Sequence, residues 1–62
     1  MFKPGQTWEN RKGESLGILD VTDDLEYPVI AMTKKKVLLR FTRDGRFINE
    51  FTKHEKDLIK LL

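Results

Sequence analysis

Six basic side chains between residues 34 and 46 are the group in this 62-residue sequence whose type and spacing suggest a definite chemistry. On two adjacent strands they can neutralise several phosphates, and exposed aromatic rings can stack on bases at about 1–3 kcal/mol per base. Tyr27 and Phe2 are the aromatic residues that we expect to be exposed. The sequence therefore predicts, as one alternative, a nucleic-acid site made of Lys34, Lys35, Lys36, Arg40, Arg43 and Arg46.

The same basic residues have an ordinary structural interpretation. Lysines are common in solvated turns and on edge strands, where they discourage pairing with other chains. Residues 1–31 hold three basic and six acidic side chains, whereas residues 32–62 hold nine basic and four acidic ones. Opposite charges on neighbouring strands can pair, at about 0.2–1 kcal/mol for each pair. For this reason nucleic-acid binding ranks second.

A second candidate surface surrounds Tyr27, beside an acidic segment. Small β domains present loops and open edges on which partners dock, and the fold alone does not fix the ligand. Mainly by elimination, the sequence predicts a protein-binding site at Tyr27, Pro28, Asp23 and Asp24. The structural alternative is a tyrosine that packs at the mouth of the domain with its hydroxyl in water.

Catalytic and metal chemistry has little support in the sequence. His54 is the single histidine, cysteine is absent, and no serine lies near His54 to act as a nucleophile. The four acidic residues between positions 20 and 26 offer oxygen ligands, but they lack the alternation and central glycine of a calcium loop. We expect a protein that is not an enzyme, with no catalytic residues, no metal site and no cofactor.

The composition is typical of a soluble folded domain, with 39% hydrophobic and 35% charged residues. We expect one domain, residues 1–62, with a small core, because a chain of this size buries only about 60% of its unfolded surface. No apolar stretch approaches the roughly 18 residues of a membrane span, and the first residues lack the apolar run of a signal peptide. A cytoplasmic location without membrane contact is therefore expected.

Turn residues divide the chain into short β-rich segments at intervals of about ten residues. Apolar residues on both faces of Leu16–Val21 predict a bulge or bend near Gly17. Strict alternation in Val37–Thr42, followed by Asp44-Gly45, predicts a hairpin over residues 37–51. We expect the core to contain Trp8, Phe41, Phe47 and Phe51. The predicted strands are residues 6–9, 16–21, 29–33, 37–42 and 46–51.

The last ten residues have a different pattern. Thr52 and Glu55 have the spacing of a capping box, and Leu58, Leu61 and Leu62 share one face of a helix that would begin there. A helix or a 3₁₀ turn fits this pattern, although a helix so short needs to dock against the domain. Leucines that a thin core leaves exposed favour self-association. The sequence therefore predicts a homodimer through Leu38, Leu61 and Leu62.

Five short strands and a terminal helical turn predict a mainly β fold. We expect a small five-stranded SH3-like barrel with a short C-terminal helix or 3₁₀ turn, and an OB-fold ranks second because it usually needs a longer chain.

Several short motifs occur in a particular order along the chain. They are Trp8-x-x-Arg11-x-Gly13, Tyr27-Pro28-Val29, Phe41-Thr42-x-Asp44-Gly45-Arg46-Phe47, and Asp57-Leu58. In this order they resemble a group of small bacteriophage- and prophage-encoded proteins, mostly of unassigned function. The resemblance implies a phage origin, an SH3-like barrel and the cytoplasm of an infected bacterium as the location. It implies no activity, so we expect a non-catalytic interaction module whose partner is a host or phage protein.

Overall fold

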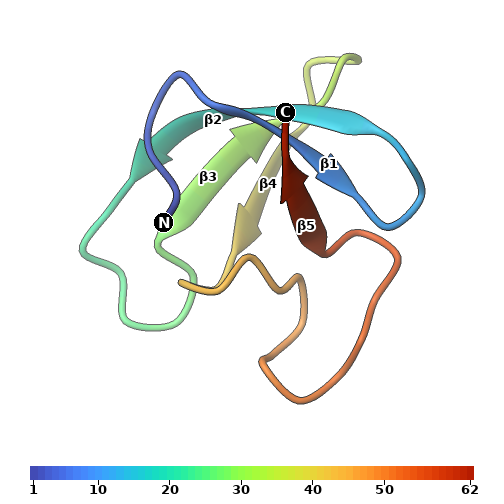
Figure 1. Ribbon diagram of the computed structural model, residues 1–62. Helices are drawn as coiled ribbons and strands as arrows, with labels where there is room; N and C mark the ends of the chain where they lie inside the picture. The colour runs from blue at the N-terminus through green and yellow to red at the C-terminus, as the bar shows by residue number, and fades with distance from the viewer.

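A computed structural model describes all 62 residues of the chain, which form five strands and no helix. The strands pair antiparallel in one sheet in the order β4-β3-β2-β1-β5 (Figure 1). The fold is therefore mainly β, as the sequence predicts. No helix is present that is long and apolar enough to cross a membrane. The strands are β1 Thr7–Asn10, β2 Ser15–Val21, β3 Val29–Met32, β4 Leu38–Phe41 and β5 Leu58–Leu61.

The longest strand, β2, lies at the centre of the sheet and contains the predicted irregularity. Its register with β3 shifts between Ile18, which pairs with Ala31, and Asp20, which pairs with Ile30. Leu19 is therefore the extra residue of a bulge, and its side chain is half exposed. The predicted bulge is confirmed, but it lies at Leu19, two residues after Gly17. A strand with apolar residues on both faces cannot bury them all with a period of two.

The core is small and lies on the concave side of the sheet. Phe41 is fully buried, and its ring packs edge-to-face against Phe47 with ring centroids 5.9 Å apart. The Trp8 ring packs against this core and against Phe2, at a centroid distance of 4.3 Å. The buried apolar residues are Leu16, Ile18, Val29, Ala31, Phe41 and Leu58.

Three aromatic residues differ from the expectation, and one of them is Tyr27, which was expected to be exposed and is half-buried. Phe51, predicted to fill the core, is 88% exposed. Phe2, predicted to be exposed, covers one end of the core, where its ring touches Gly45 so closely that a Cβ on that glycine would collide with it. Residues near the N-terminus can thus supply core volume that a sequence pattern does not assign to any strand.

The hairpin predicted over residues 37–51 is half correct. The turn forms, since the Gly45 N–H donates to the Thr42 carbonyl and the Thr42 N–H donates to the Arg46 carbonyl. The predicted return strand 46–51 is wrong, because the chain leaves β4 after this turn. The Phe47 N–H donates to the Asp57 carboxylate instead of a strand partner. Residues 46–57 form a long connection with a single isolated bridge between Asn49 and Thr52.

The predicted C-terminal helix is also wrong. Residues 58–61 form β5, which pairs with β1 so that Trp8 lies opposite Leu61. The Thr52 N–H donates to the Asn49 side chain, and no helix begins at Thr52. A strand is preferred here because it pairs the backbone of β1, which would otherwise be an open edge, whereas an isolated short helix gains little.

The sheet is not closed, so the expected barrel is not formed. β4 and β5 remain the two edges of a strongly curved sheet (Figure 1). One backbone hydrogen bond, from the Leu58 N–H to the Gly45 carbonyl at 2.8 Å, links the start of β5 to the turn after β4. Gly45 suits this turn because its φ of 83° lies in the left-handed region that glycine adopts readily.

Candidate interaction surfaces

The connection between β2 and β3 holds Tyr27 in a fixed position. The Asp24 carboxylate accepts the backbone N–H groups of Glu26 and Tyr27, which closes the turn. The Tyr27 hydroxyl donates to the Ile48 carbonyl at 2.7 Å, and Arg40 Nε donates to the Tyr27 carbonyl at 3.1 Å. The predicted tyrosine is therefore anchored at both ends, and its hydroxyl binds the long connection after β4.

The hydrogen bonds of Asp24 also affect the pKa of its carboxyl group. The backbone N–H of Tyr27 holds the pKa of the Asp24 carboxyl below its usual range, with further help from Glu26 and Arg40. Asp23, beside it, is exposed and makes no hydrogen bond with its side chain. Of the four residues predicted to contact a protein, Asp23 and Asp24 are exposed, Tyr27 is half-buried and Pro28 is buried.

A groove of about 380 Å³ lies where the β2–β3 connection meets the connection after β4. Tyr27 lines it together with Leu25, Ile48 and Phe51, and we name it the Tyr27 groove. Leu25 is 93% exposed and Phe51 is 88% exposed, so these two large apolar side chains of the groove are almost unpacked within the protein. The charged residues that line it are Glu26, Arg43, Asp44 and Glu50.

The six basic residues predicted to contact nucleic acid do not form one stripe. Arg40 is bound to Tyr27 and to the Thr22 hydroxyl, and Arg46 lies 3.6 Å from the Asp57 carboxylate. Arg43 lines the Tyr27 groove. Lys36 lies in the turn before β4 with a φ of 68°. Of the six, only Lys34 and Lys35 line one cavity together, and Arg40 and Arg46 make contacts within the protein.

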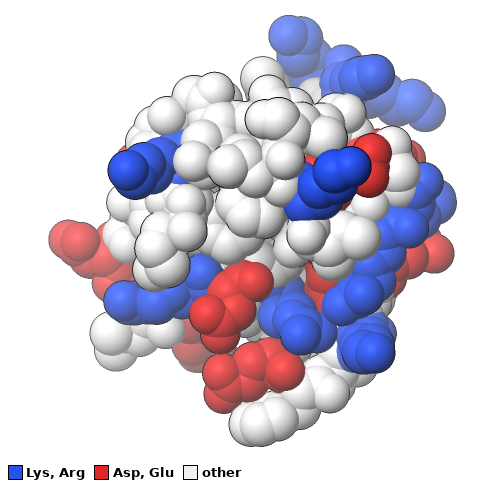
Figure 2. Space-filling model, in the orientation of Figure 1, with Lys and Arg blue, Asp and Glu red and all other residues white.

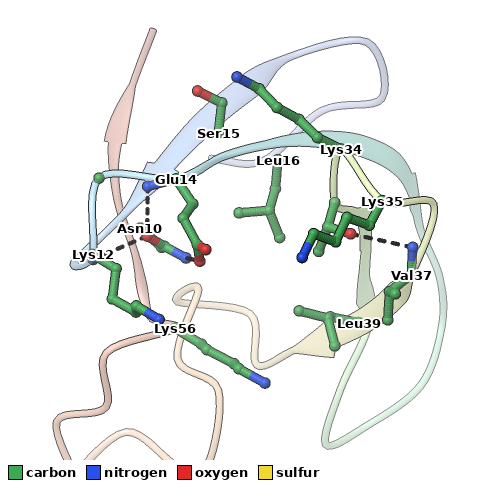
Figure 3. Close-up of a pocket in the computed structure, with 12 residues that line it drawn as sticks. Asn10, Lys12, Glu14, Ser15, Leu16, Lys34, Lys35, Val37, Leu39 and Lys56 are labelled. Carbon is green, nitrogen blue, oxygen red and sulfur yellow. Dashed lines mark hydrogen bonds between the residues drawn. The ribbon is translucent and has the colours of Figure 1, made fainter.

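Lys34 and Lys35 line a second cavity together with two further lysines. This cavity of about 530 Å³ is lined by Lys12, Lys34, Lys35 and Lys56, and we name it the lysine pocket. In Figure 3, Lys35 is directed toward the middle of the pocket from one wall, and Glu14 lies on the opposite wall. Figure 2 shows blue side chains at the turn before β4 and along the side of the molecule formed by the β1–β2 connection.

The walls of the lysine pocket are held by a tight turn between β1 and β2. The buried Asn10 side chain accepts the N–H groups of Lys12 and Glu14 and donates to the Glu14 carboxylate (Figure 3). The Asn10 bond keeps the pKa of Glu14 below its ordinary value, and Lys12 and Lys56 add to this effect. Glu14 is therefore a fixed carboxylate among ammonium groups.

Asp57 is a buried acidic residue to which the sequence patterns assigned no role. Its carboxylate is buried and accepts N–H groups from Phe47 at 2.8 Å, His54 at 2.9 Å and Arg11 at 3.2 Å. Burial works against its ionisation, but the hydrogen bonds from Phe47, His54 and Arg11 outweigh burial and lower the pKa of Asp57. Every polar contact is internal, so Asp57 holds the structure together. Only the short Asp57-Leu58 motif pointed to it.

His54 has a structural position. Its Nδ1 accepts the Lys56 N–H, and its ring lies against Phe47 at a centroid distance of 4.9 Å. It therefore lies in the long connection and not in the predicted helix turn. No group of three or more histidine, cysteine, aspartate or glutamate side chains comes together as a metal site.

The three leucines predicted to mediate a dimer lie on or beside the edge strands. Leu38 on β4 is 59% exposed, Leu61 on β5 is 50% exposed and the adjoining Leu62 is 57% exposed. They belong to opposite edges of the sheet, so a single edge does not contain all three.

Comparison with known proteins gives no relative. No protein-family model, curated protein or solved structure matches the chain.

Proposed function

We propose that this protein is a small non-catalytic interaction module that binds a protein partner through the Tyr27 groove. The observation that carries the proposal is the exposure of Leu25 and Phe51, at 93% and 88%, in the lining of one groove. Single exposed leucines are ordinary, but two large unpartnered side chains over a preformed hollow offer the apolar anchors of a binding site.

The area of these side chains is large enough to matter. Burial of one large apolar side chain contributes about 1.5–3 kcal/mol, so the pair contributes about 3–6 kcal/mol. A micromolar complex needs about 8 kcal/mol. Leu25 and Phe51 can therefore supply a large share of the affinity for a short segment of a partner.

Charge around the groove specifies the chemistry of that segment. Three carboxylates (Glu26, Asp44 and Glu50) and one cation (Arg43) line the groove, and Asp23 and Asp24 lie in the same connection as Leu25. Opposite charge at the rim of an interface improves the rate and specificity of association. The partner is thus a protein segment with a large apolar side chain flanked by Lys or Arg.

The hydrogen bonds that hold the two connections around the groove also favour binding. The Asp24 turn and the bond from the Tyr27 hydroxyl to Ile48 join the two connections before any partner arrives. A prepared surface reduces the entropy lost on binding. The structural role of Tyr27 and its role in the groove are therefore compatible.

Selection of random peptides on the immobilised protein tests the proposal. We expect the selected peptides to combine a large apolar residue with Lys or Arg. They should bind the Leu25→Ser/Phe51→Ser variant at least about tenfold more weakly. The matched control is Leu38→Ser/Leu62→Ser, which changes two exposed leucines outside the groove and should bind like the parent protein. Peptides that bind both variants equally, or that are acidic, would contradict the proposal.

Nucleic-acid binding through the six basic residues is the alternative proposal. It has less support, because the guanidinium groups of Arg40 and Arg46 already contact other parts of the protein. A titration with DNA and RNA at increasing salt separates the two, because binding to phosphates weakens steeply with salt. Loss of binding in a Lys34→Gln/Lys35→Gln/Lys36→Gln variant that remains folded would favour the alternative, and no binding at low salt would eliminate it.

The origin of the protein is also a proposal. The order of the short motifs supports kinship with bacteriophage-encoded proteins, and with it a host or phage protein as the partner in the bacterial cytoplasm.

A further inference from the structure

The lysine pocket brings together charges that the sequence keeps apart. Lys12 comes from the connection between β1 and β2, Lys34 and Lys35 from the turn before β4, and Lys56 from the residues before β5. Three separate segments therefore contribute lysines to the lining of one cavity of about 530 Å³, and the Lys35 side chain is directed toward its middle (Figure 3). No part of the protein-binding proposal uses this cavity.

The positive charge of the pocket is poorly neutralised from within the protein. Lys34 and Lys35 form no ion pair, and Lys12 has only a long contact of 3.8 Å with Glu55 at the exposed surface. Lys56 lies over the Phe47 ring, 5.0 Å from its centroid. Glu14 is the single carboxylate in the lining, against four ammonium groups. The cavity therefore favours an anion with more than one negative charge.

The other residues that line the pocket indicate that the anion is part of an organic molecule with an apolar portion. Leu16, Val37 and Leu39 supply apolar lining. The Asn10 amide holds one oxygen of the Glu14 carboxylate at 3.0 Å, which leaves the second oxygen open to a hydroxyl or amino donor (Figure 3). Small-molecule sites commonly have this combination of apolar walls and a few placed polar groups, with volumes of about 300–1,000 Å³.

We infer that the lysine pocket binds a nucleoside phosphate. The phosphates lie among Lys34, Lys35, Lys12 and Lys56, and Glu14 accepts a hydrogen bond from a hydroxyl or amino group of the nucleoside. A free nucleotide and the terminal nucleotide of a single strand share this chemistry. The pocket depends on concave walls from three segments, which suits one nucleotide better than the side of a duplex.

Calorimetric titration of the intact protein at low salt with ATP, adenosine and pyrophosphate tests the inference. We expect ATP to bind more tightly than either of its parts. In the Lys34→Gln/Lys35→Gln variant, affinity for ATP should fall at least about tenfold. The matched control is Lys36→Gln/Lys60→Gln, which removes the same charge outside the pocket and should change ATP binding less than about twofold. Equal losses in the two variants would overturn the site, as would no binding of millimolar ATP.

The Glu14→Gln variant separates the proposed pocket from simple attraction between charges. It removes the one negative charge in the lining, so affinity for pyrophosphate should rise. If Glu14 contacts the nucleoside, affinity for ATP should fall or stay level in the same variant. A parallel rise for both ligands would overturn the role of Glu14, and tighter binding of an acidic peptide than of ATP would overturn the ligand class.

A short 5′-phosphorylated oligonucleotide identifies the source of the nucleotide. Tighter binding of this strand than of ATP assigns the pocket to the end of a nucleic acid, and weaker binding assigns it to a free nucleotide; either result supports the shared chemistry. Amide spectra of each variant, recorded by NMR, confirm the fold. The Leu25→Ser/Phe51→Ser variant should bind ATP normally, so this test and that of the Tyr27 groove can fail independently.

Discussion

At the scale of single residues, Asp57 has the largest structural effect. One buried carboxylate joins the turn after β4, the residues before β5 and the connection after β1, through Phe47, His54 and Arg11. The loss of one member of such a network leaves the other members buried without partners, which costs more than the bonds contribute. A domain of this size has a total stability of only about 3–9 kcal/mol.

We expect Asp57→Asn to lower the free energy of unfolding by about 2–4 kcal/mol, because the amide cannot accept at both positions or neutralise Arg11. Urea unfolding followed by tryptophan fluorescence measures the change. Asp23→Asn is the matched control, since Asp23 is exposed and should alter stability by less than about 0.5 kcal/mol. Equal stability of the two variants would contradict the role given to Asp57.

The same carboxylate predicts how stability depends on pH. The pKa of Asp57 is lower in the folded protein than in the unfolded chain, so its ionised form favours folding. This stabilisation is present above the ordinary aspartate pKa of about 4 and disappears as pH falls through the lower folded value. Unfolding free energies measured between pH 7 and pH 2 should decrease below about pH 4. The decrease should be smaller in Asp57→Asn, and an unchanged pH profile would contradict this account.

At the scale of elements, the contrast between β4 and β5 shows what a local pattern can predict. β1 to β4 follow the expected strands closely, because alternation and turn residues are local signals. Residues 46–51 look like a strand by their own composition, but the distant Asp57 holds Phe47 away from β4. Leu58, Leu61 and Leu62 fit a helical face, yet the unpaired edge of β1 selects a strand.

The candidate surfaces, too, could be predicted only in part from local sequence patterns. Tyr27, Lys34 and Lys35 were identified from their residue types. Leu25 and Phe51, which carry the groove, gave no signal because their exposure depends on how the two connections meet. Lys12 and Lys56 joined the lysine pocket only through folding, since they lie more than 20 residues from Lys34 in the sequence.

The β5 strand gives a prediction that separates it from a helix. Leu58 is 4% exposed and Leu61 is 50% exposed, whereas one helical face would cover both. We expect Leu58→Ala to lower the free energy of unfolding by about 2–4 kcal/mol and Leu61→Ala by less than about 1 kcal/mol. Urea unfolding of both variants measures the difference. Equal losses would favour the helical arrangement.

At the scale of the whole molecule, the open sheet leaves backbone groups unpaired along β4 and β5. Such edges pair readily with another chain unless charge or covering residues prevent it. Lys60 supplies one charge on β5, but the neighbouring Ile59 and Leu61 are each 50% exposed. Pairing of two β5 edges would form a closed dimer, whereas pairing of β4 with β5 would repeat from copy to copy.

We therefore expect the protein to form a dimer that uses the edge leucines. Sedimentation equilibrium over a range of concentrations should show the dimer mass, and Leu61→Lys should shift the population toward the monomer because it places a like charge beside Lys60. Leu25→Lys, at an exposed site far from β5 in the sheet order, is the control and should leave the mass unchanged. A monomer at every concentration would contradict the dimer.

The pairing of β1 with β5 also determines how the domain resists mechanical force. Trp8 near the start of the sheet lies opposite Leu61, and the Leu62 N–H donates to the Thr7 carbonyl at 2.9 Å. A pull that separates Thr7 from Leu62 acts across this antiparallel pair and loads its outermost hydrogen bond first. The bonds would then break one after another like a zipper, at low force, and not together in shear.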